Sequence, residues 1–300
     1  MDRILLTGGS GFLSSNWSLD TRNIFFNYAL VRSKNKNKFL KLFQIDFKNN
    51  KDLIQVFKKV KPKIVIHTAA ITDVDKCEMN KKLSEKVNFQ LTKKISNICK
   101  KEKIKLIFIS SDQVFSQKKK NTENFRKSPI NFYSLHKSMS EDFIKKNLND
   151  YLIIRTNFFG VAPNSKKSFL NFVKYNLEKG KKIQLIDNLI HNPISVHLLI
   201  KYLTILIKQN YKGVFHISSN EKITKFELGI QICKVFNLNE KFIEKTDLSS
   251  FNFKAKRPKY MFLNNDKIKK TIKKNIPSIQ KQLRDISNKF KKGYYKNFKF

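Results

Sequence analysis

Ser111, Tyr133 and Lys137 are residues whose types and spacing could carry proton transfer at a carbonyl group. Tyr133 and Lys137 stand at the start of a predicted helix that runs to about Asn147. Residues four apart share one face of a helix, so we expect the phenol and the ammonium to lie side by side. A tyrosine titrates at about 10 when unperturbed, and an adjacent ammonium would lower its pKa. The phenol could then donate or accept a proton near neutral pH.

A hydroxyl cluster upstream supports this interpretation. The spacing of Tyr133 and Lys137 alone indicates little, because the chain has 62 Lys and Arg residues among 300. Ser110 and Ser111, however, directly follow a predicted strand at residues 106–109 and so lie at the carboxyl edge of the sheet. There the Ser111 hydroxyl could hydrogen-bond a substrate oxygen. These three residues form the predicted catalytic set, and no metal site is expected.

Glycine is rare in this chain, and three of its eight glycines crowd one loop. The loop lies between an apolar strand at residues 4–6 and a predicted helix start. A tight strand-to-helix turn needs residues without Cβ, and a pyrophosphate must approach bare N–H groups at a helix N-terminus. The pattern favours a dinucleotide site over an ordinary tight turn. Its predicted residues, in the loop around Gly9, are Gly8, Gly11, Phe12 and Leu13.

The residues after the second strand indicate which dinucleotide is bound. An acidic residue there would bind the ribose hydroxyls of NAD. Here Val31 is followed by Arg32, Ser33 and Lys34. Two cations and a hydroxyl suit a 2′-phosphate, so NADP(H) is favoured and NAD(H) stays the alternative. The oxidised nicotinamide is positively charged and would lower the pKa of Tyr133 further.

Apolar runs that alternate with amphipathic stretches would position these residues. Fully apolar strands separated by helices predict a parallel sheet covered on both faces. Right-handed crossovers then give an α/β fold, a Rossmann-type doubly wound parallel sheet with a smaller C-terminal substrate-binding lobe. The predicted sheet strands are residues 4–6, 24–31, 39–45, 64–68, 106–109, 152–154 and 214–217. The other predicted helices are residues 51–60, 81–101, 169–179, 196–208 and 226–236.

The chain is expected to divide into two parts. Residues 1–160 would form a NAD(P)-binding Rossmann domain, rejoined by about residues 189–218. Residues 161–300 would form mainly the substrate-binding lobe, which grows from loops at the carboxyl ends of the strands. The C-terminal third is basic and looks irregular. The segment between Phe12 and Ile24 is short and polar, so the first crossover helix is expected to be abbreviated.

The net charge of +39 suggests nucleic-acid or membrane binding at first sight. Lysine is spread along the whole chain, however, and is abundant together with asparagine, isoleucine and phenylalanine, which is typical of a composition bias. No nucleic-acid-binding motif accompanies the charge. No run of about 18 apolar residues occurs, and no signal-peptide pattern is present. With three scattered cysteines, the sequence predicts a cytoplasmic protein without nucleic-acid or membrane partners.

With these motifs in place, the chain resembles the extended short-chain dehydrogenase/reductase superfamily, and within it the dTDP-4-dehydrorhamnose reductase family. The resemblance covers most of the chain. It includes an alanine-rich signature after the fourth strand, which is fairly specific. The matching segments are residues 7–13, 67–78, 87–88, 110–115, 133 with 137, 185–188, 192–193, 213–218 and 255–258.

The resemblance implies NADPH-dependent reduction of the 4-keto group of a nucleotide-linked 6-deoxysugar, such as dTDP-4-dehydro-L-rhamnose, in deoxysugar and cell-surface polysaccharide biosynthesis. Tyr133 would protonate the new hydroxyl, Lys137 would hold the nicotinamide ribose, and Ser111 would orient the keto oxygen. The partner is a nucleotide-sugar, and a homodimer is compatible with the fold. Three further residues would lie near the cofactor: Ala69 and Ala70 beside it, and Asp46 near the adenine.

Two departures from the family pattern qualify these expectations. Ser14 replaces the third glycine of the loop and is expected to loosen packing without abolishing binding. Gln113 replaces a tyrosine that faces substrate in the rhamnose enzymes, which leaves the sugar open. A redox-neutral, NAD-dependent nucleotide-sugar epimerase or dehydratase is the alternative enzyme. A cofactor-binding regulatory subunit, such as the family members that partner methionine adenosyltransferase, is the alternative of another class.

Two further features are interpreted as structural. His67, on a buried strand, is predicted to be a satisfied core histidine. The acidic pair Glu141 and Asp142 is predicted to be the solvated face of the helix that carries Tyr133.

Overall fold

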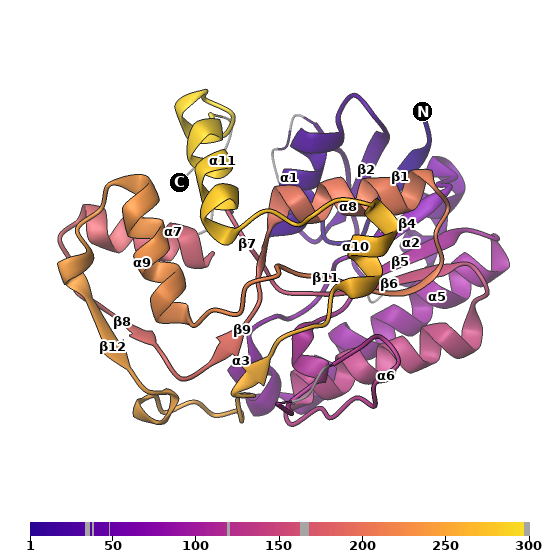
Figure 1. Cartoon of the computed structure of the whole chain (residues 1–300). Helices are drawn as coiled ribbons and strands as arrows, with labels where there is room; N and C mark the ends of the chain where they lie inside the picture. Colours follow the sequence, from indigo (N-terminus) through magenta and orange to yellow (C-terminus); the bar gives the residue numbers. More distant parts are fainter. Residues whose placement is uncertain (34–36, 38, 48, 119–120, 163–167, 297–300) are drawn as a thin grey trace.

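A seven-stranded parallel sheet forms the centre of the molecule (Figure 1). The computed structural model describes residues 1–296 apart from 34–36, 38, 48, 119–120 and 163–167. The strands lie in the order β11-β6-β5-β4-β1-β2-β3, which confirms the predicted doubly wound sheet. The order reverses between β1 and β4, where ligands bind in such sheets. The strands are β1 (Arg3–Leu6), β2 (Phe26–Val31), β3 (Lys41–Gln44), β4 (Ile64–His67), β5 (Lys105–Ile109), β6 (Tyr151–Thr156) and β11 (Gly213–Ile217).

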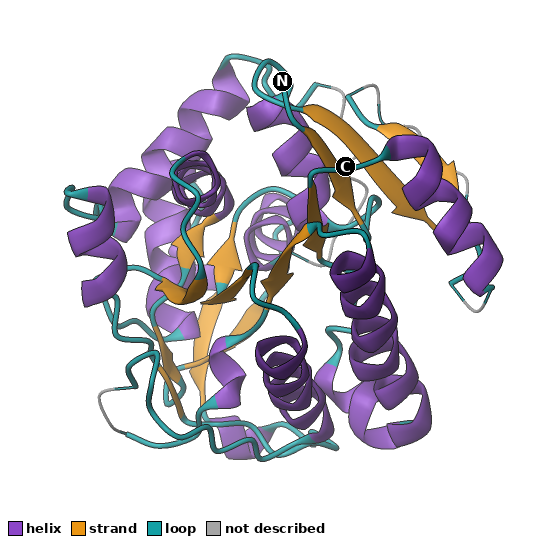
Figure 2. Cartoon of the chain, turned by 90° about the vertical axis from the view of Figure 1, so that its right-hand side faces the viewer, coloured by secondary structure: helices purple, strands orange, loops and turns teal. Residues whose placement is uncertain are grey.

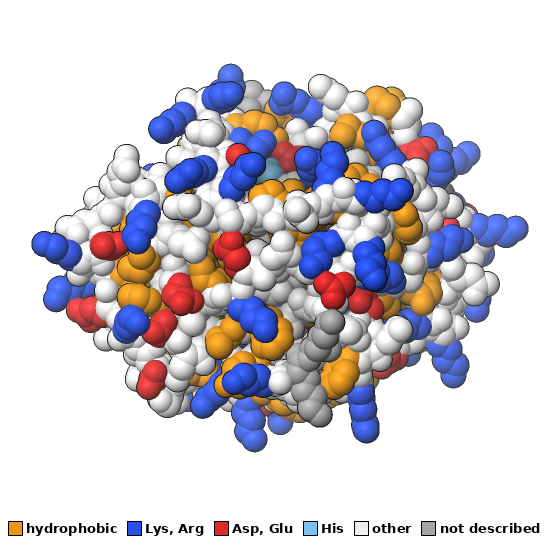
Figure 3. All heavy atoms as spheres, viewed as in Figure 1, with side chains coloured by type: hydrophobic (Ala, Val, Ile, Leu, Met, Phe, Trp, Pro, Cys, Tyr) orange, Lys and Arg blue, Asp and Glu red, His pale blue; other side chains and the backbone are white. Residues whose placement is uncertain are grey.

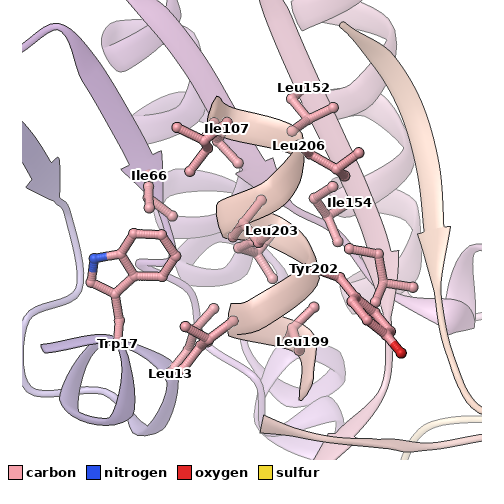
Figure 4. Packing of buried hydrophobic residues seen from close by; sticks show 14 of the residues in the cluster. Leu13, Trp17, Ile66, Ile107, Leu152, Ile154, Leu199, Tyr202, Leu203 and Leu206 are labelled. Carbon is pink, nitrogen blue, oxygen red and sulfur yellow. The ribbon is translucent and has the colours of Figure 1, made fainter. Parts of the chain in front are cut away.

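Helices cover both faces of this sheet, as its nearly continuous apolar strands require (Figure 2). In Figure 4, Leu199 and Leu203 of α8 pack with Trp17 of α1 beside Ile66 and Ile107 of the sheet. Burying side chains of this size contributes about 1.5–3 kcal/mol each, so the two layers hold each other in place. One face carries α1 (Phe12–Thr21), α8 (Val196–Lys208) and α10 (Asp266–Ile272), and the other carries α2 (Asn50–Val60), α5 (Leu91–Lys101) and α6 (Phe132–Asn147).

A second lobe has its own apolar core. It consists of α7 (Phe169–Glu178), α9 (Lys225–Phe236) and α11 (Ile279–Lys291) around β8 (Ile183–Ile186), which pairs in parallel with β12 (Ile243–Thr246). Figure 1 shows this lobe to one side of the main sheet. Two short parallel pairs complete the described strands: β7 (Phe158–Phe159) with β10 (Ile194–Ser195), and β9 (Ile190–His191) with β13 (Tyr260–Met261).

Three predicted elements differ in the structure. The C-terminal third is not irregular, because α10 and α11 are helices and α11 buries Ile279, Leu283 and Ile286 along one face. The first crossover helix is not abbreviated: α1 has ten residues, against eleven in α2. Its buried polar side chains bond to backbone carbonyls, as Asn16 does to Val161 at 2.9 Å. The helix predicted over 81–101 is α4 (Lys81–Glu85), a π-helical turn η1 (Lys86–Gln90) and α5.

Lysine and arginine side chains are spread over the face of the molecule in Figure 3 and do not gather in one patch. This distribution fits the interpretation of the net charge as a composition bias. Among the described residues, no helix is long and apolar enough to cross a membrane.

Candidate functional site

A pocket of about 370 Å³ opens where the order of the sheet reverses, between β1 and β4. A larger hollow of about 940 Å³, between α1, α8 and α11, contains none of the predicted site residues. The smaller pocket brings together predicted dinucleotide and catalytic residues: Gly11, Phe12, Leu13, Ala70, Ser111, Tyr133 and Lys137. The rest of its lining is Thr68, Thr72, Ile109, Ser110, Asp112, Gln113, Thr156, Asn157 and Phe158.

The glycine loop packs so closely on its neighbours that side chains would not fit. A Cβ at Gly8 would lie 2.7 Å from Thr68 Oγ1, and one at Gly9 would meet a β2 side chain at 2.7 Å. Gly11 is the N-cap of α1 and supplies no side-chain cap, so the first-turn N–H groups stay available to an anion. Ser14 is fully buried, with Oγ 3.2 Å from Thr68 Oγ1. The loosening expected at Ser14 is therefore not observed.

His67 is the core histidine that the sequence predicts. Its Nδ1 lies 2.7 Å from Thr7 Oγ1 and its Nε2 lies 2.9 Å from Thr92 Oγ1. Burial lowers the pKa of His67 to about 3, so the ring is neutral. Thr7 Oγ1 already accepts from the N–H groups of residues 68 and 69, so we assign its hydrogen to His67 Nδ1 and the ring hydrogen to Nε2. This network ties the end of β1 to the end of β4 behind the glycine loop.

Asn88 holds the segment that follows β4. Its Oδ1 accepts from the Ile71 N–H at 2.8 Å, and its Nδ2 donates to the Ile71 carbonyl at 3.1 Å. Asn88 lies in η1, and its own carbonyl accepts from Thr92 Oγ1 at 3.0 Å and from Ser140 Oγ at 2.8 Å. Asn88 therefore links α5, α6 and the segment containing Ala70, which lines the pocket.

Lys137 lies one helical turn after Tyr133 on the buried face of α6. Its Nζ donates to the Ile109 carbonyl at 2.9 Å and lies 4.6 Å from the centre of the Phe108 ring. Burial lowers the pKa of Lys137 to about 8, while Glu141 acts in the opposite direction. The ammonium is therefore the main form at neutral pH, and it is held at the end of β5.

Tyr133 lines the pocket and is buried. Burial raises the pKa of its phenol, and a hydrogen bond with Ser111 opposes this only in part. The expectation that Lys137 lowers the pKa of Tyr133 is wrong for the chain by itself, because the ammonium is directed to the Ile109 carbonyl. Tyr133 consequently keeps its proton at neutral pH and can act as a proton donor.

Asp112 is a residue of the pocket that the sequence did not single out. Its Oδ1 accepts from Ser111 Oγ at 3.0 Å, and its Oδ2 accepts from Asn157 Nδ2 at 2.7 Å. Burial raises the pKa of Asp112 to about 6, although both hydrogen bonds act to lower it. Ser111 Oγ also accepts from the Gln113 N–H at 3.1 Å, so the serine is fixed on two sides. The available signal in the sequence was the position of Asp112 directly after Ser111.

Glu141 is not solvated, contrary to the prediction. Its side chain is 0% exposed, whereas that of Asp142 is 64% exposed. Glu141 Oε2 lies 2.7 Å from Arg155 Nη2, and its Oε1 accepts from Ser110 Oγ at 2.6 Å. Burial alone would raise the pKa of Glu141, but Arg155, Lys127 and Ser110 together hold it below its usual range. This buried pair fixes α6 to β6 behind the pocket.

Two segments far apart in the sequence meet next to Tyr133. Asp75 Oδ2 lies 2.9 Å from Arg257 Nη2, and its Oδ1 accepts from the Ala255 N–H at 2.9 Å. Ala255 in turn belongs to a small apolar cluster with Cys77 and Tyr133. The residues that carried the family resemblance near positions 75 and 257 therefore pack together against the α6 tyrosine.

The other predicted cofactor residues lie outside the lining of the pocket. Arg32 directly follows β2 and Asp46 lies beyond β3, and both are exposed at the carboxyl edge of the sheet. Lys34 lies outside the described residues. Gly8 and Ala69 are in contact behind the loop, since a Cβ at Gly8 would lie 3.1 Å from the Ala69 nitrogen.

Known proteins share this fold and sequence pattern. The family described as RmlD substrate binding domain matches residues 1–292. The probable low-salt glycan biosynthesis reductase Agl14 of Haloferax volcanii is 23% identical over 254 residues, which cover 83% of this chain and 85% of that protein. Methionine adenosyltransferase 2 subunit beta of Xenopus laevis is 24% identical over 245 residues, which cover 79% and 72%.

Solved structures agree with this match at the level of the fold. The dTDP-4-dehydrorhamnose reductase of Bacillus anthracis in complex with NADP superposes with a TM-score of 0.83 at 24% identity and covers 96% of this chain and 99% of that one. The dTDP-glucose 4,6-dehydratase of the same organism, in complex with NAD, gives a TM-score of 0.80 at 19% identity and covers 100% of both chains. Structural relatives thus bind NADP or NAD. The chain belongs to the RmlD substrate binding domain family, a family of NAD(P)-dependent reductases within the extended short-chain dehydrogenases/reductases.

Proposed function

We propose that this protein is an NADPH-dependent reductase of the 4-keto group of a nucleotide-linked 6-deoxysugar, with dTDP-4-dehydro-L-rhamnose as the first substrate to test. The observation that carries the proposal is that one pocket is lined by Gly11 of the glycine loop together with Ser111, Tyr133 and Lys137. A dinucleotide loop and a set of proton-transfer residues at one sheet edge suit hydride transfer to a carbonyl.

The residues present fit a dinucleotide. The close approach of Gly8 to Thr68 leaves bare backbone at the loop, and the uncapped start of α1 offers N–H groups to a pyrophosphate. NADPH, when bound, supplies the hydride that reduces the carbonyl carbon. The exposed Arg32 after β2 suits the 2′-phosphate, and this supports NADPH over NADH. Gly8, Gly11, Phe12, Leu13 and the alanines after β4 would hold the rest of the cofactor, with Asp46 near the adenine.

Tyr133 is the proton donor in this proposal. Reduction adds a hydride to the carbonyl carbon and a proton to the carbonyl oxygen, and the raised pKa of Tyr133 keeps that proton on the phenol until it is needed. The Lys137 ammonium, fixed on the Ile109 carbonyl, would hold the nicotinamide ribose and stabilise the phenolate that forms. Solvent then returns the proton to the phenolate.

Ser111 would orient the keto oxygen. In the chain itself, the Ser111 hydroxyl donates to Asp112 at 3.0 Å. It has one hydrogen, so it can donate to a substrate oxygen only when it turns away from that carboxylate. Asp112 thereby controls where the Ser111 hydrogen points. Gln113 also lines the pocket, and an amide there would contact the sugar by hydrogen bonds to hydroxyl groups.

The test is consumption of NADPH, measured by absorbance, with dTDP-4-dehydro-L-rhamnose under single-turnover and multiple-turnover conditions. We expect one NADPH oxidised per sugar reduced, and a slower reaction with NADH. No loss of NADPH at saturating enzyme would refute this substrate assignment. Product formation with bound NAD and no net consumption would favour the redox-neutral epimerase or dehydratase.

A regulatory role is the second candidate, because methionine adenosyltransferase 2 subunit beta is among the similar proteins. Tyr133 and Lys137 line the pocket together, and this arrangement supports catalysis over regulation. Tyr133→Phe distinguishes the two. A regulatory subunit would keep its biological effect and its NADP binding in this variant, whereas a reductase would lose its effect and keep only the binding.

A further inference from the structure

Asp112 is the only carboxylate among the described residues that line the catalytic pocket. It is 2% exposed, and both of its oxygens accept from neutral side chains: Oδ1 from Ser111 Oγ at 3.0 Å and Oδ2 from Asn157 Nδ2 at 2.7 Å. Within the described part of the chain, no cationic nitrogen lies within 4 Å of it. A buried carboxylate without an ion pair takes up a proton more readily than a solvated one.

The ionised form of Asp112 occupies the Ser111 hydroxyl. A hydroxyl has one hydrogen and two acceptor lone pairs. The Ser111 hydrogen goes to Asp112, and one lone pair accepts from the Gln113 N–H at 3.1 Å. A hydrogen bond also joins Ser111 and Tyr133, and the phenol must be its donor because Ser111 has no second hydrogen. In this state, the two hydrogens that could bind a keto oxygen are both used within the chain.

Protonation of Asp112 reverses this arrangement. The new hydrogen belongs on Oδ1, because a hydrogen on Oδ2 would face the Nδ2 donor of Asn157 at 2.7 Å. From Oδ1 it donates to Ser111 Oγ, which still accepts from the Gln113 N–H. With both lone pairs occupied, Ser111 accepts nothing from Tyr133 and turns its own hydrogen to the pocket. The Tyr133 hydrogen is released at the same time.

We propose that Asp112 is a positioning residue that acts in its protonated form: it donates to Ser111 Oγ and thereby directs the hydrogens of Ser111 and Tyr133 to the keto oxygen of the substrate. This rests on the proposed function, because the keto oxygen is that of the nucleotide-linked sugar. Ser111 then stabilises the oxygen on which negative charge develops, and Tyr133 supplies the proton. Asp112 acts through Ser111 and keeps its own proton throughout the reaction.

The charges around Asp112 allow it to exchange a proton near neutral pH. Lys225, at the start of α9, favours the carboxylate, whereas the Lys137 ammonium of α6 is directed to the Ile109 carbonyl. Burial outweighs Lys225 and the hydrogen bonds, and it raises the pKa of Asp112 to about 6. Tyr133 keeps its proton over this range, because burial and the Asp112 charge both raise its pKa. A ligand that displaces water from the pocket would raise the pKa of Asp112 further.

Infrared difference spectroscopy tests the protonation of Asp112 without a sugar. Titration of the NADPH complex between about pH 5 and 8 should show the carbonyl stretch of a buried carboxylic acid, with an apparent pKa of about 6 or higher. Asp112→Asn should remove this band. Ser111→Ala should shift it to higher frequency, because the acid loses the oxygen to which it donates, and this shift assigns the band even if Asp112→Asn does not fold. A band that is absent throughout, or that Ser111→Ala leaves unchanged, would overturn the proposal.

Asp112→Asn is the main kinetic variant. Its amide should place the oxygen opposite Asn157 Nδ2 and the NH₂ group opposite Ser111 Oγ, and so reproduce the hydrogen bond of the protonated acid at every pH. With saturating NADPH, kcat/KM of the unchanged protein should fall about tenfold per pH unit above the pKa of Asp112. Asp112→Asn should stay within about tenfold of the highest value and keep only the fall near pH 8 that Lys137 causes. The matched control Asp142→Asn, which alters an exposed carboxylate of α6, should show both falls.

Ser111→Ala separates positioning from an effect of charge through space. The Asp112 charge also raises the pKa of Tyr133, so a fall in activity could arise without Ser111. Ser111→Ala should lower kcat/KM by about 10²–10³, and its remaining activity should not fall at the pKa of Asp112. A fall that persists in Ser111→Ala would overturn the proposal, as would a folded Asp112→Asn variant that is as inactive as Ser111→Ala. If the unchanged protein oxidises no NADPH with the 4-keto sugar, the proposed function falls, and the infrared titration still decides whether Asp112 donates to Ser111.

Discussion

Removing the buried carboxylate of Glu141 tests the structural reasoning most sharply. The side chains of Glu141 and Arg155 are 0% and 1% exposed, so neither is screened by water. Arg155 Nε donates to Glu141 Oε1 at 3.0 Å and Nη2 donates to Oε2 at 2.7 Å, while Ser110 Oγ donates to Oε1 at 2.6 Å. Glu141→Ala would leave the guanidinium buried without its carboxylate. Breaking such a pair costs about 3–5 kcal/mol, a large part of the roughly 5–15 kcal/mol that stabilises a typical protein.

Asp142 provides the matched control on the next residue of the same helix. Its carboxylate is 64% exposed and lies 2.6 Å from Lys127 Nζ. Exposed pairs contribute roughly 0–1 kcal/mol, so Asp142→Ala should change stability little. Urea denaturation followed by fluorescence measures both variants, because the chain has a single tryptophan, the buried Trp17. Equal and small losses in Glu141→Ala and Asp142→Ala would refute the buried ion pair.

The pH dependence of this stability has a defined sign. The pKa of Glu141 is lower in the folded chain than in the unfolded one. Its contribution is therefore complete above its ordinary pKa of about 4.3 and is lost as the pH falls through the depressed folded value. Glu141→Gln should remove the part of the free energy of unfolding that is lost at acid pH. Because Glu141 also raises the pKa of Lys137, the same variant should move the alkaline limb of the activity profile to lower pH.

Four further outcomes follow from the site. Tyr133→Phe should lower kcat by about 10²–10⁴ and leave NADPH binding unchanged in titration; unchanged kcat would exclude the phenol as the proton donor. kcat/KM should fall as the pH rises through about 8, because Lys137 then loses its charge; a flat profile to pH 9.5 would contradict this role. Gly8→Ala places a Cβ 2.7 Å from Thr68 Oγ1, so calorimetry should show a free energy of unfolding about 1–3 kcal/mol lower and weaker NADPH binding. Wild-type values for both would contradict the close packing of the glycine loop. Arg32→Ala should weaken NADPH binding and leave NADH binding unchanged. Equal weakening of both would show that Arg32 does not bind the 2′-phosphate.

The sheet and its helices were predictable because their pattern is local. Fully apolar runs such as residues 106–109 are typical of strands that are covered on both faces, and β5 is indeed buried along its length. The bounds of α8 match the predicted 196–208 because Ser195 caps a strongly apolar stretch. The meeting of the glycine loop with Ser111 and Tyr133 also followed, since segments after parallel strands share one edge.

The errors arise where a distant contact overrides the local pattern. Glu141 beside Asp142 looks like a solvated helix face, and its partner Arg155 becomes visible only when β6 is placed against α6. The many lysines around α11 made the segment look irregular, although the spacing of Ile279, Leu283 and Ile286 in the sequence is that of one helix face. The direction of the pKa shift at Tyr133 depends on burial and on where the Lys137 ammonium points, and neither follows from their spacing of four.

Transfer of deuterium from NADPH that carries deuterium at both hydrogen positions of C4 of its nicotinamide ring is the most direct measurement of the proposed reaction. With dTDP-4-dehydro-L-rhamnose as substrate, mass spectrometry of the product should find one deuterium at C4 of the sugar for each NADPH oxidised, and Tyr133→Phe should slow its appearance. An unlabelled product, or a product formed while NADPH remains unconsumed, would contradict the assignment of a reductase.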